Sequence, residues 1–279
     1  RARGRAERAL GLAAAHHPDL LAMARTYAGL AAQGAGDLAA ARTFCEQALT
    51  TTPAPGLPLF IDVHTMALFH LGRVLCLQGE VDAGIRRVQE AERRVRADGL
   101  PFDRIQTLHH LGDLWRVLGR HDAARTVFDE VLGLAERHAL DYYSAHARAS
   151  LWSLGADPVP SGGLDAWMAV LDRAGDVWCA VSLRLFIVDS LCERGDAAEA
   201  RRQLQALQGL RAGVPALLQP RQCAALAAVL ALEGAAPQAV DAAWADGLRL
   251  AQASGSGLMQ WLLAPGQRHG PRRALPACC

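Results

Sequence analysis

The chain has 279 residues, of which 51% are hydrophobic and 5% aromatic, and its 29 basic residues nearly balance its 28 acidic ones. A formal net charge of +1 creates no global field that would attract nucleic acid or an anionic membrane, so we expect neither as a direct partner. The sequence contains no lysine and no asparagine. This absence excludes a P-loop lysine, a Schiff-base lysine and an N-glycosylation site.

Cysteine spacing and hydropathy bear on the cellular compartment. The seven cysteines show neither the spacing of a disulfide framework nor that of a zinc finger, which favours a reducing compartment. The longest uninterrupted apolar run, Cys223 to Leu232, has ten residues and is too short to span a bilayer. We therefore predict a cytoplasmic protein.

A short pattern recurs along the chain: an apolar helix, a glycine with a polar neighbour, and a second apolar helix. The turn glycines are 36 to 43 residues apart, at Gly36, Gly79, Gly119, Gly155, Gly195 and Gly234. Self-similarity at about 34 to 47 residues with two helices per unit is typical of a helical solenoid. Alternating β-branched residues are nearly absent. The predicted fold class is all-α, a right-handed superhelix of about six helix pairs.

Apolar spacing and the Gly and Pro breaks predict the elements in order. Residues 1–17 are interpreted as the second helix of a repeat truncated upstream, and residues 18–257 as the array. The pairs are predicted at 19–34 with 38–51, 59–78 with 81–97, 102–118 with 121–138, 140–154 with 163–174, 176–194 with 197–209, and 215–233 with 236–254. Residues 258–279 begin a further helix and then lose the helical period, which indicates a disordered or out-of-frame tail.

Two units resemble the tetratricopeptide repeat. Its small, large and turn positions are matched by Leu68, Leu71, Gly72, Leu75, Gly79 and Ala91, and again by Leu108, Leu111, Gly112, Trp115, Gly119, Ala124 and Phe128. The units of about 40 residues are similar to the long-helix arrays of large bacterial signalling proteins, such as transcriptional regulators of the LuxR and MalT kind and multidomain cyclases. In those families the repeats bind an effector or a partner, while another domain does chemistry or binds DNA.

The resemblance implies a concave groove lined by the first helix of each pair. Its predicted binding residues are Met66, Phe69 and Arg73 in the second unit, Gln106, His109, Asp113 and Arg116 in the third, and Ser182 and Asp189 in the fifth. Arg73 and Arg116 are candidates to hold carboxylates, because a guanidinium presents a planar donor fork. The alternative is that these side chains only solvate the groove. The chaperone-binding carboxylate clamp of related repeats uses lysine and asparagine, which this chain lacks.

The leading functional prediction is a module that binds a peptide, a protein segment or an effector in this groove. The partner would be a separate protein or another domain of the same full-length protein. The alternative prediction is the regulatory region of a transcriptional regulator or signalling enzyme whose catalytic or DNA-binding domain lies outside this chain. No Ser/His/Asp or Cys/His catalytic constellation stands out, so we predict no enzymatic activity, no catalytic residues and no cofactor.

Several local patterns have simpler readings than a chemical site. Gly34 to Ala39 fits a loose dinucleotide fingerprint, but a helix precedes it where a strand is required. The arginine-rich segment from Arg86 to Arg96 includes Glu90 and Glu92 and reads as a self-paired solvated surface. His109 and His110, with His70 and His64, lack the three- or four-residue spacing of two histidine ligands on one helix face, so no metal site is predicted.

Overall fold

The computed structural model describes residues 2–17, 20–51, 62–155, 163–210 and 213–264. Within these ranges the chain is helical with short connections and contains no strand. Consecutive helices pack against each other in pairs and each pair packs on the next. The predicted all-α solenoid fold is therefore confirmed. None of the helices in the described ranges is long and apolar enough to cross a membrane.

The predicted helix pairs are present, with ends that differ by a few residues. They are α2 (Leu21–Gly34) with α3 (Leu38–Leu49), α4 (Val63–Gln78) with α5 (Val81–Asp98), α6 (Pro101–Val117) with α7 (His121–Arg137), α8 (Asp141–Ser153) with α9 (Gly163–Ala174), α10 (Val177–Glu193) with α11 (Ala197–Ala206), and α12 (Gln219–Leu232) with α13 (Pro237–Ala253). Single 3₁₀ turns, η2 (Leu207–Gly209) and η3 (Ala216–Leu218), extend α11 and precede α12.

Helix α1 (Ala2–His16) packs on α2 at the start of the array, and α14 (Gly257–Leu262) packs on α13 at its end. Whether α1 belongs to a truncated upstream repeat stays a prediction. The tail predicted to be disordered or out of frame lies, from residue 265 onward, outside the described residues. Residues 156–162, between α8 and α9, also lie outside the described residues.

Local chemistry explains where the helices begin and end. Asp62, Asp176 and Ser256 accept hydrogen bonds from backbone N–H groups of the first turns of α4, α10 and α14, as side-chain N-caps do. The six predicted turn glycines all have positive φ, for example +100° at Gly79. This left-handed conformation ends one helix sharply and is cheap only for glycine.

Two further glycines, at small positions of the repeat resemblance, allow close helix crossings. A Cβ atom on Gly72 would lie 2.5 Å from Val88 Cγ2, and one on Gly112 would lie 2.7 Å from the Phe128 ring. The large side chains that carry the repeat resemblance lie in the core: Leu71, Leu75, Leu111, Trp115 and Phe128 have exposures of 6% or less, as do Leu191 and Leu204 of the fifth pair. Small residues at crossings and large ones between them thus hold each pair together.

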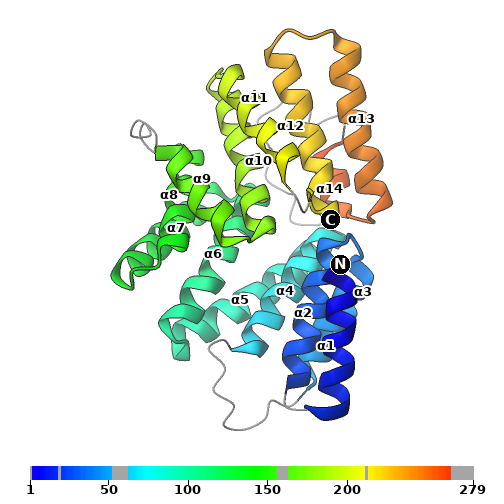
Figure 1. The fold of residues 1–279 in the computed structure, drawn as a ribbon, viewed down its shortest axis with the longest axis vertical. Helices are drawn as coiled ribbons and strands as arrows, with labels where there is room; N and C mark the ends of the chain where they lie inside the picture. The colour runs from blue at the N-terminus through cyan, green and yellow to red at the C-terminus, as the bar shows by residue number, and fades with distance from the viewer. Residues whose placement is uncertain (1, 18–19, 52–61, 156–162, 211–212, 265–279) are drawn as a thin grey trace.

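The array curves far enough to bring distant units into contact. In Figure 1 the array runs from α1–α5 through α6–α9 and then returns through α10–α14. Its last helix, α14, packs against α4. Ser256 donates its hydroxyl hydrogen to the carbonyl oxygen of Leu77 at 2.9 Å, across 179 residues of sequence. Gly257 packs on the backbone of Gln78. The solenoid is therefore a closed turn, whereas each unit of a helical repeat array ordinarily contacts only its neighbours.

Candidate functional site

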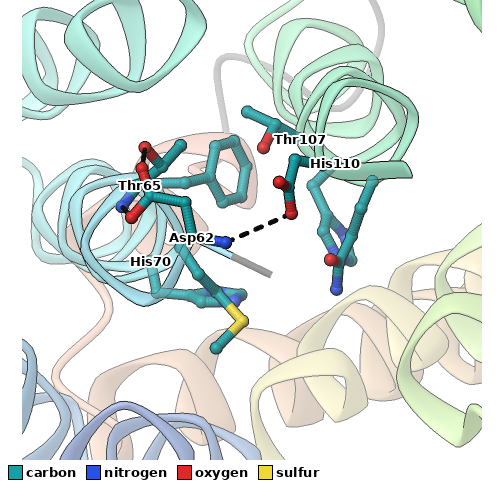
Figure 2. Close-up of a pocket in the computed structure, with 9 residues that line it drawn as sticks. Asp62, Thr65, His70, Thr107 and His110 are labelled. Atoms are coloured by element: carbon teal, nitrogen blue, oxygen red, sulfur yellow. Dashed lines mark hydrogen bonds between the residues drawn. The ribbon is translucent and has the colours of Figure 1, made fainter. Parts of the chain in front are cut away.

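The first helices of the pairs face the inside of the turn, where two pockets adjoin at His110. The first pocket lies between α4 and α6, as the facing side chains of Figure 2 show. Its lining residues are Asp62, Thr65, Met66, Phe69, His70, Asp103, Gln106, Thr107 and His110. The backbone N–H of Asp62 donates to Asp103 Oδ1 at 3.2 Å, which closes one side of the pocket.

The second pocket is bounded by α4, α6, α10, η3, α12 and α14. It has a volume of about 40 Å³ and is mainly apolar with a charged end. The polar residues of its wall are Arg73, His110, Asp113, Ser182 and Arg221; Trp178 and leucines such as Leu77, Leu217 and Leu258 form the rest. Leu77 comes from α4 and Leu258 from α14, so the contact that closes the turn also forms this pocket.

The predicted groove residues do converge on this inner surface, although not as one open groove. Met66, Phe69 and Gln106 line the first pocket, while Arg73, Asp113 and Ser182 line the second. His109 and Arg116 are buried behind the pocket walls at 1% and 2% exposure. Asp189 forms an ion pair with Arg221 at 2.8 Å.

Arg73 is held in place by its own chain. Its Nη2 donates to Gln33 Oε1 at 2.9 Å and lies 3.0 Å from His70 Nδ1. The guanidinium carbon is 5.1 Å from the ring centroid of Trp178, a cation–π distance. The Nε of Arg73 is buried and has no hydrogen-bond partner. Burial lowers the pKa of this guanidinium, so its charge is imperfectly compensated.

The contacts of Arg116 differ from the expectation that this residue holds the carboxylate of a ligand. Its Nη2 is 2.9 Å from Asp113 Oδ1, its Nη1 donates to Ser153 Oγ at 2.7 Å, and its guanidinium carbon lies 3.6 Å from the Phe186 ring centroid. Burial lowers the pKa of Arg116 to about 10 despite the Asp113 charge. Like Arg73, Arg116 has a buried Nε without a hydrogen-bond partner, but Arg116 is 2% exposed and is not among the residues that line the second pocket. The side chain is therefore a buried structural partner of Asp113.

A compact group of potential metal ligands lies between the pockets. Ligand atoms of His109, His110, Asp113 and Cys179 all lie within 4.8 Å of one another. Cys179 Sγ is 3.4 Å from His109 Nε2, and His109 Nδ1 is 3.2 Å from His146 Nδ1. Among the described residues, these four form a group with the number and kind of side chains that a metal ion requires.

The surroundings of this group are polar and buried. His146 is fully buried, and its Nε2 lies 3.5 Å from Asp113 Oδ2. Ser150 Oγ is 3.3 Å from His146 Nδ1. The phenol of Tyr142 donates to Asp176 Oδ2 at 3.1 Å. Buried polar groups in such numbers require partners, because an unpaired one costs about 1–3 kcal/mol.

Burial is the main influence on the ionisation of these groups. It lowers the pKa of His109 well below its usual range and, with the Arg73 charge, that of His110 to about 4. Burial and the Asp176 charge raise the pKa of the Cys179 thiol. Burial opposes ionisation of Asp113, yet His146 and Arg116 hold its pKa below the usual value. At neutral pH the group thus presents two neutral imidazoles, a thiol and a carboxylate.

Sequence reasoning did not find this cluster, because it considered only histidine pairs. His109 and Asp113 are four residues apart and share a face of α6, which is a recognisable ligand spacing. Cys179 is 70 residues further along, on α10, and no local pattern connects it to α6. His146, on α8, was also missed.

Two other readings made from the sequence agree with the contacts. In the arginine-rich segment, Arg87 pairs with Glu90 at 3.2 Å and Arg96 pairs with Glu92 at 2.9 Å. Gly34 is the last residue of α2 and Gly36 lies in the turn before α3, so these glycines follow a helix and not a strand.

Comparison with protein-family models and with curated proteins finds no match for this chain. The resemblance to tetratricopeptide repeats therefore rests on the residues quoted for it.

Proposed function

We propose that this chain is a binding module that receives an acidic group of a partner protein, a peptide or an effector in the second pocket. The observation that carries the proposal is the state of Arg73: a half-buried arginine on the pocket wall, at a cation–π distance from Trp178, whose buried Nε has no hydrogen-bond partner. A carboxylate is the group that such a donor binds best, because charge and hydrogen bond reinforce each other.

The charges around the pocket are consistent with an anionic ligand. Asp113 is the carboxylate among its lining residues, but its charge is engaged by Arg116 at 2.9 Å. Ser182 adds a hydroxyl that can donate a second hydrogen bond. The apolar remainder of the wall, including Leu217 and Leu258, favours an apolar neighbour beside the carboxylate. A C-terminal carboxylate after an apolar residue has this chemistry.

The alternative, a regulatory region that acts on a missing catalytic or DNA-binding domain, is favoured by a different observation. The pocket wall contains Leu77 from α4 and Leu258 from α14, so a ligand there touches both sides of the closing contact. Occupancy would then stabilise the closed turn and change the shape presented to a neighbouring domain. The flanking coding sequence tests this: an adjacent nucleotide-binding, helix-turn-helix or cyclase domain supports it.

The direct test is a peptide library with free C-terminal carboxylates, compared with the same peptides as C-terminal amides. Binding that needs the carboxylate, and that falls at least about tenfold in Arg73→Gln, supports the proposal. Arg87→Gln, on the exposed face of α5, is the matched control and should bind like the wild type. Ser182→Val is a second pocket variant that keeps the arginine contacts intact.

Equal binding of acids and amides, or equal binding by Arg73→Gln with an unchanged circular dichroism melt, would contradict this assignment of the pocket. A partner whose binding responds to Arg87→Gln but not to the pocket variants would instead place recognition on the outer surface.

A further inference from the structure

The geometry points to a structural zinc site formed by His109, His110, Asp113 and Cys179, which would join α6 to α10 across the inside of the turn. The inference is independent of the proposed function, because it concerns the wall between the pockets and needs no ligand in either. It rests on four donor atoms that come from two helices and converge within 4.8 Å of one another.

The donor set is the first argument for zinc. Two imidazole nitrogens, a thiolate and a carboxylate oxygen combine the ligands that Zn²⁺ accepts, while calcium and magnesium require oxygen ligands. Four protein ligands leave no open position, which is typical of structural rather than catalytic zinc. Asp113 and Cys179 would supply two negative charges and neutralise the ion within a buried environment.

The distances fit the size of a zinc tetrahedron. With Zn–N near 2.0 Å and Zn–S near 2.3 Å, a nitrogen and a sulfur ligand lie roughly 3.5 Å apart. The observed separation of His109 Nε2 and Cys179 Sγ is 3.4 Å. The widest separations in the group, up to 4.8 Å, need to contract by roughly 1.5 Å, because nitrogen and oxygen ligands of a zinc tetrahedron lie about 3.3 Å apart. His110 and Asp113 are only partly buried, so their side chains have room to move.

The contacts behind the site orient the ring of His109. Its Nδ1 lies 3.2 Å from His146 Nδ1, in a hydrogen-bond contact on the far side of the ring from the cluster. Its Nε2 is the nitrogen that faces Cys179, at 3.4 Å from Sγ. A metal-bound histidine is usually oriented by such a hydrogen bond on its other nitrogen.

The second pocket provides an entry path. His110 and Asp113 both line it, whereas His109 and Cys179 lie behind them at 1% exposure each. Zn²⁺ would bind with loss of its water ligands and of the Cys179 thiol proton: the S–H bond breaks, the electron pair forms the S–Zn bond, and the proton leaves to solvent. No oxidant or reductant takes part.

Cobalt provides the first test, because Co²⁺ substitutes for zinc and is coloured. The full chain, stripped of metal by a chelator and kept reduced, is titrated with CoCl₂ and then with ZnCl₂. We expect one equivalent of Co²⁺ to give a thiolate-to-metal charge-transfer band and intense tetrahedral d–d bands, which zinc then abolishes. A spectrum identical to hexaaqua cobalt would overturn the inference.

Variants identify the ligands. Cys179→Ser should weaken cobalt and zinc binding at least about tenfold and remove the charge-transfer band. His110→Gln should weaken binding of both metals by a similar factor. Cys192→Ser is the matched control, because Cys192 lies on the same helix outside the cluster. Unchanged affinity in both Cys179→Ser and His110→Gln would overturn the site, whichever residues then bind the metal.

A measurement on the unmodified sequence guards against variants that fail to fold. In moderate urea, where local opening exposes buried thiols, zinc should slow alkylation of Cys179 several-fold more than that of the buried Cys45 and Cys76, read by mass spectrometry of peptides. Equal slowing of all three thiols would indicate general stabilisation and would overturn the assignment of Cys179 as a ligand.

Discussion

The first and second helices of the pairs differ in how they meet solvent. The second helices α5 and α7 bury one stripe and pair charges on the outside, as with Arg87 and Glu90. The first helices α4, α6 and α10 are buried on most of their surface. Several of their polar residues, among them His70, His109 and Arg184, lie at 7% exposure or less. Polar residues buried to this extent need partners inside the protein.

The largest expected effect comes from breaking a partnership of the first helices. Arg116→Leu leaves Asp113, whose side chain is 14% exposed, without its guanidinium partner and should lower the free energy of unfolding by about 3 kcal/mol. Chemical denaturation measures this. Arg87→Leu, which removes an exposed ion pair on α5, should change stability by less than about 1 kcal/mol. Equal effects of the two substitutions would mean that the inner surface is not distinct from the outer one.

The next effect concerns the crossing of a first helix with its second. Gly112→Leu should cost about 1–3 kcal/mol, because a Cβ there already lies 2.7 Å from the Phe128 ring. Thermal melting of this variant is compared with Gly133→Leu on α7, where an added Cβ meets nothing within 4 Å. We expect the control to be neutral or slightly stabilising, since leucine is the better helix former. A neutral Gly112→Leu would place the crossing elsewhere.

A smaller effect on stability, but a visible one on shape, should follow from opening the turn. A Cβ on Gly257 would lie 2.7 Å from the carbonyl oxygen of Gln78, so Gly257→Val should weaken the α14–α4 contact by about 1–2 kcal/mol. Small-angle X-ray scattering should then give a larger radius of gyration. The control is Gly34→Ala, because an added Cβ there has no atom within 4 Å. Gly255→Ala would not serve, since the positive φ of Gly255 would strain any other residue. An unchanged radius would show that other contacts hold the turn closed.

The smallest expected effect lies on the outer surface between units. Glu130 pairs with Arg96 at 2.8 Å and with Arg104 at 2.5 Å. Burial opposes its ionisation, but the two guanidiniums lower the pKa of Glu130 below the usual value. A lowered folded-state pKa stabilises the fold above the unfolded pKa, and this contribution is lost as pH falls. Glu130→Gln should therefore cost less than about 1 kcal/mol at pH 7 and nothing in acid. A cost that persists in acid would exclude the ion pairs as its cause.

Sequence reasoning could predict the helices and their crossings because these depend on local signals. Gly79 and Gly119 mark turns, and Gly72 and Gly112 mark close approaches, whatever lies elsewhere in the chain. It could not predict that Arg116 would be buried. The sequence also could not predict the contact between α14 and α4, because the curvature of the array is the sum of small rotations over all units. No local pattern indicates that Ser256 will contact Leu77. The zinc-type cluster was missed for the same reason, since Cys179 meets His109 only through that curvature.

The hydrogen bond between Ser256 and Leu77 also has a consequence for how the molecule folds. Helical repeats gain most of their stability from neighbours in sequence, so folding can start in any unit and spread. A contact across 179 residues cannot form until the units between are ordered, because closing so long a flexible loop is entropically unfavourable. We expect the contact between α14 and α4 to form last during folding and to break first during unfolding. In native-state hydrogen exchange, the free energy of the opening that exposes the amides of α14 should therefore be smaller than that for the amides of α6. Each such opening would also expose the inner surface to water.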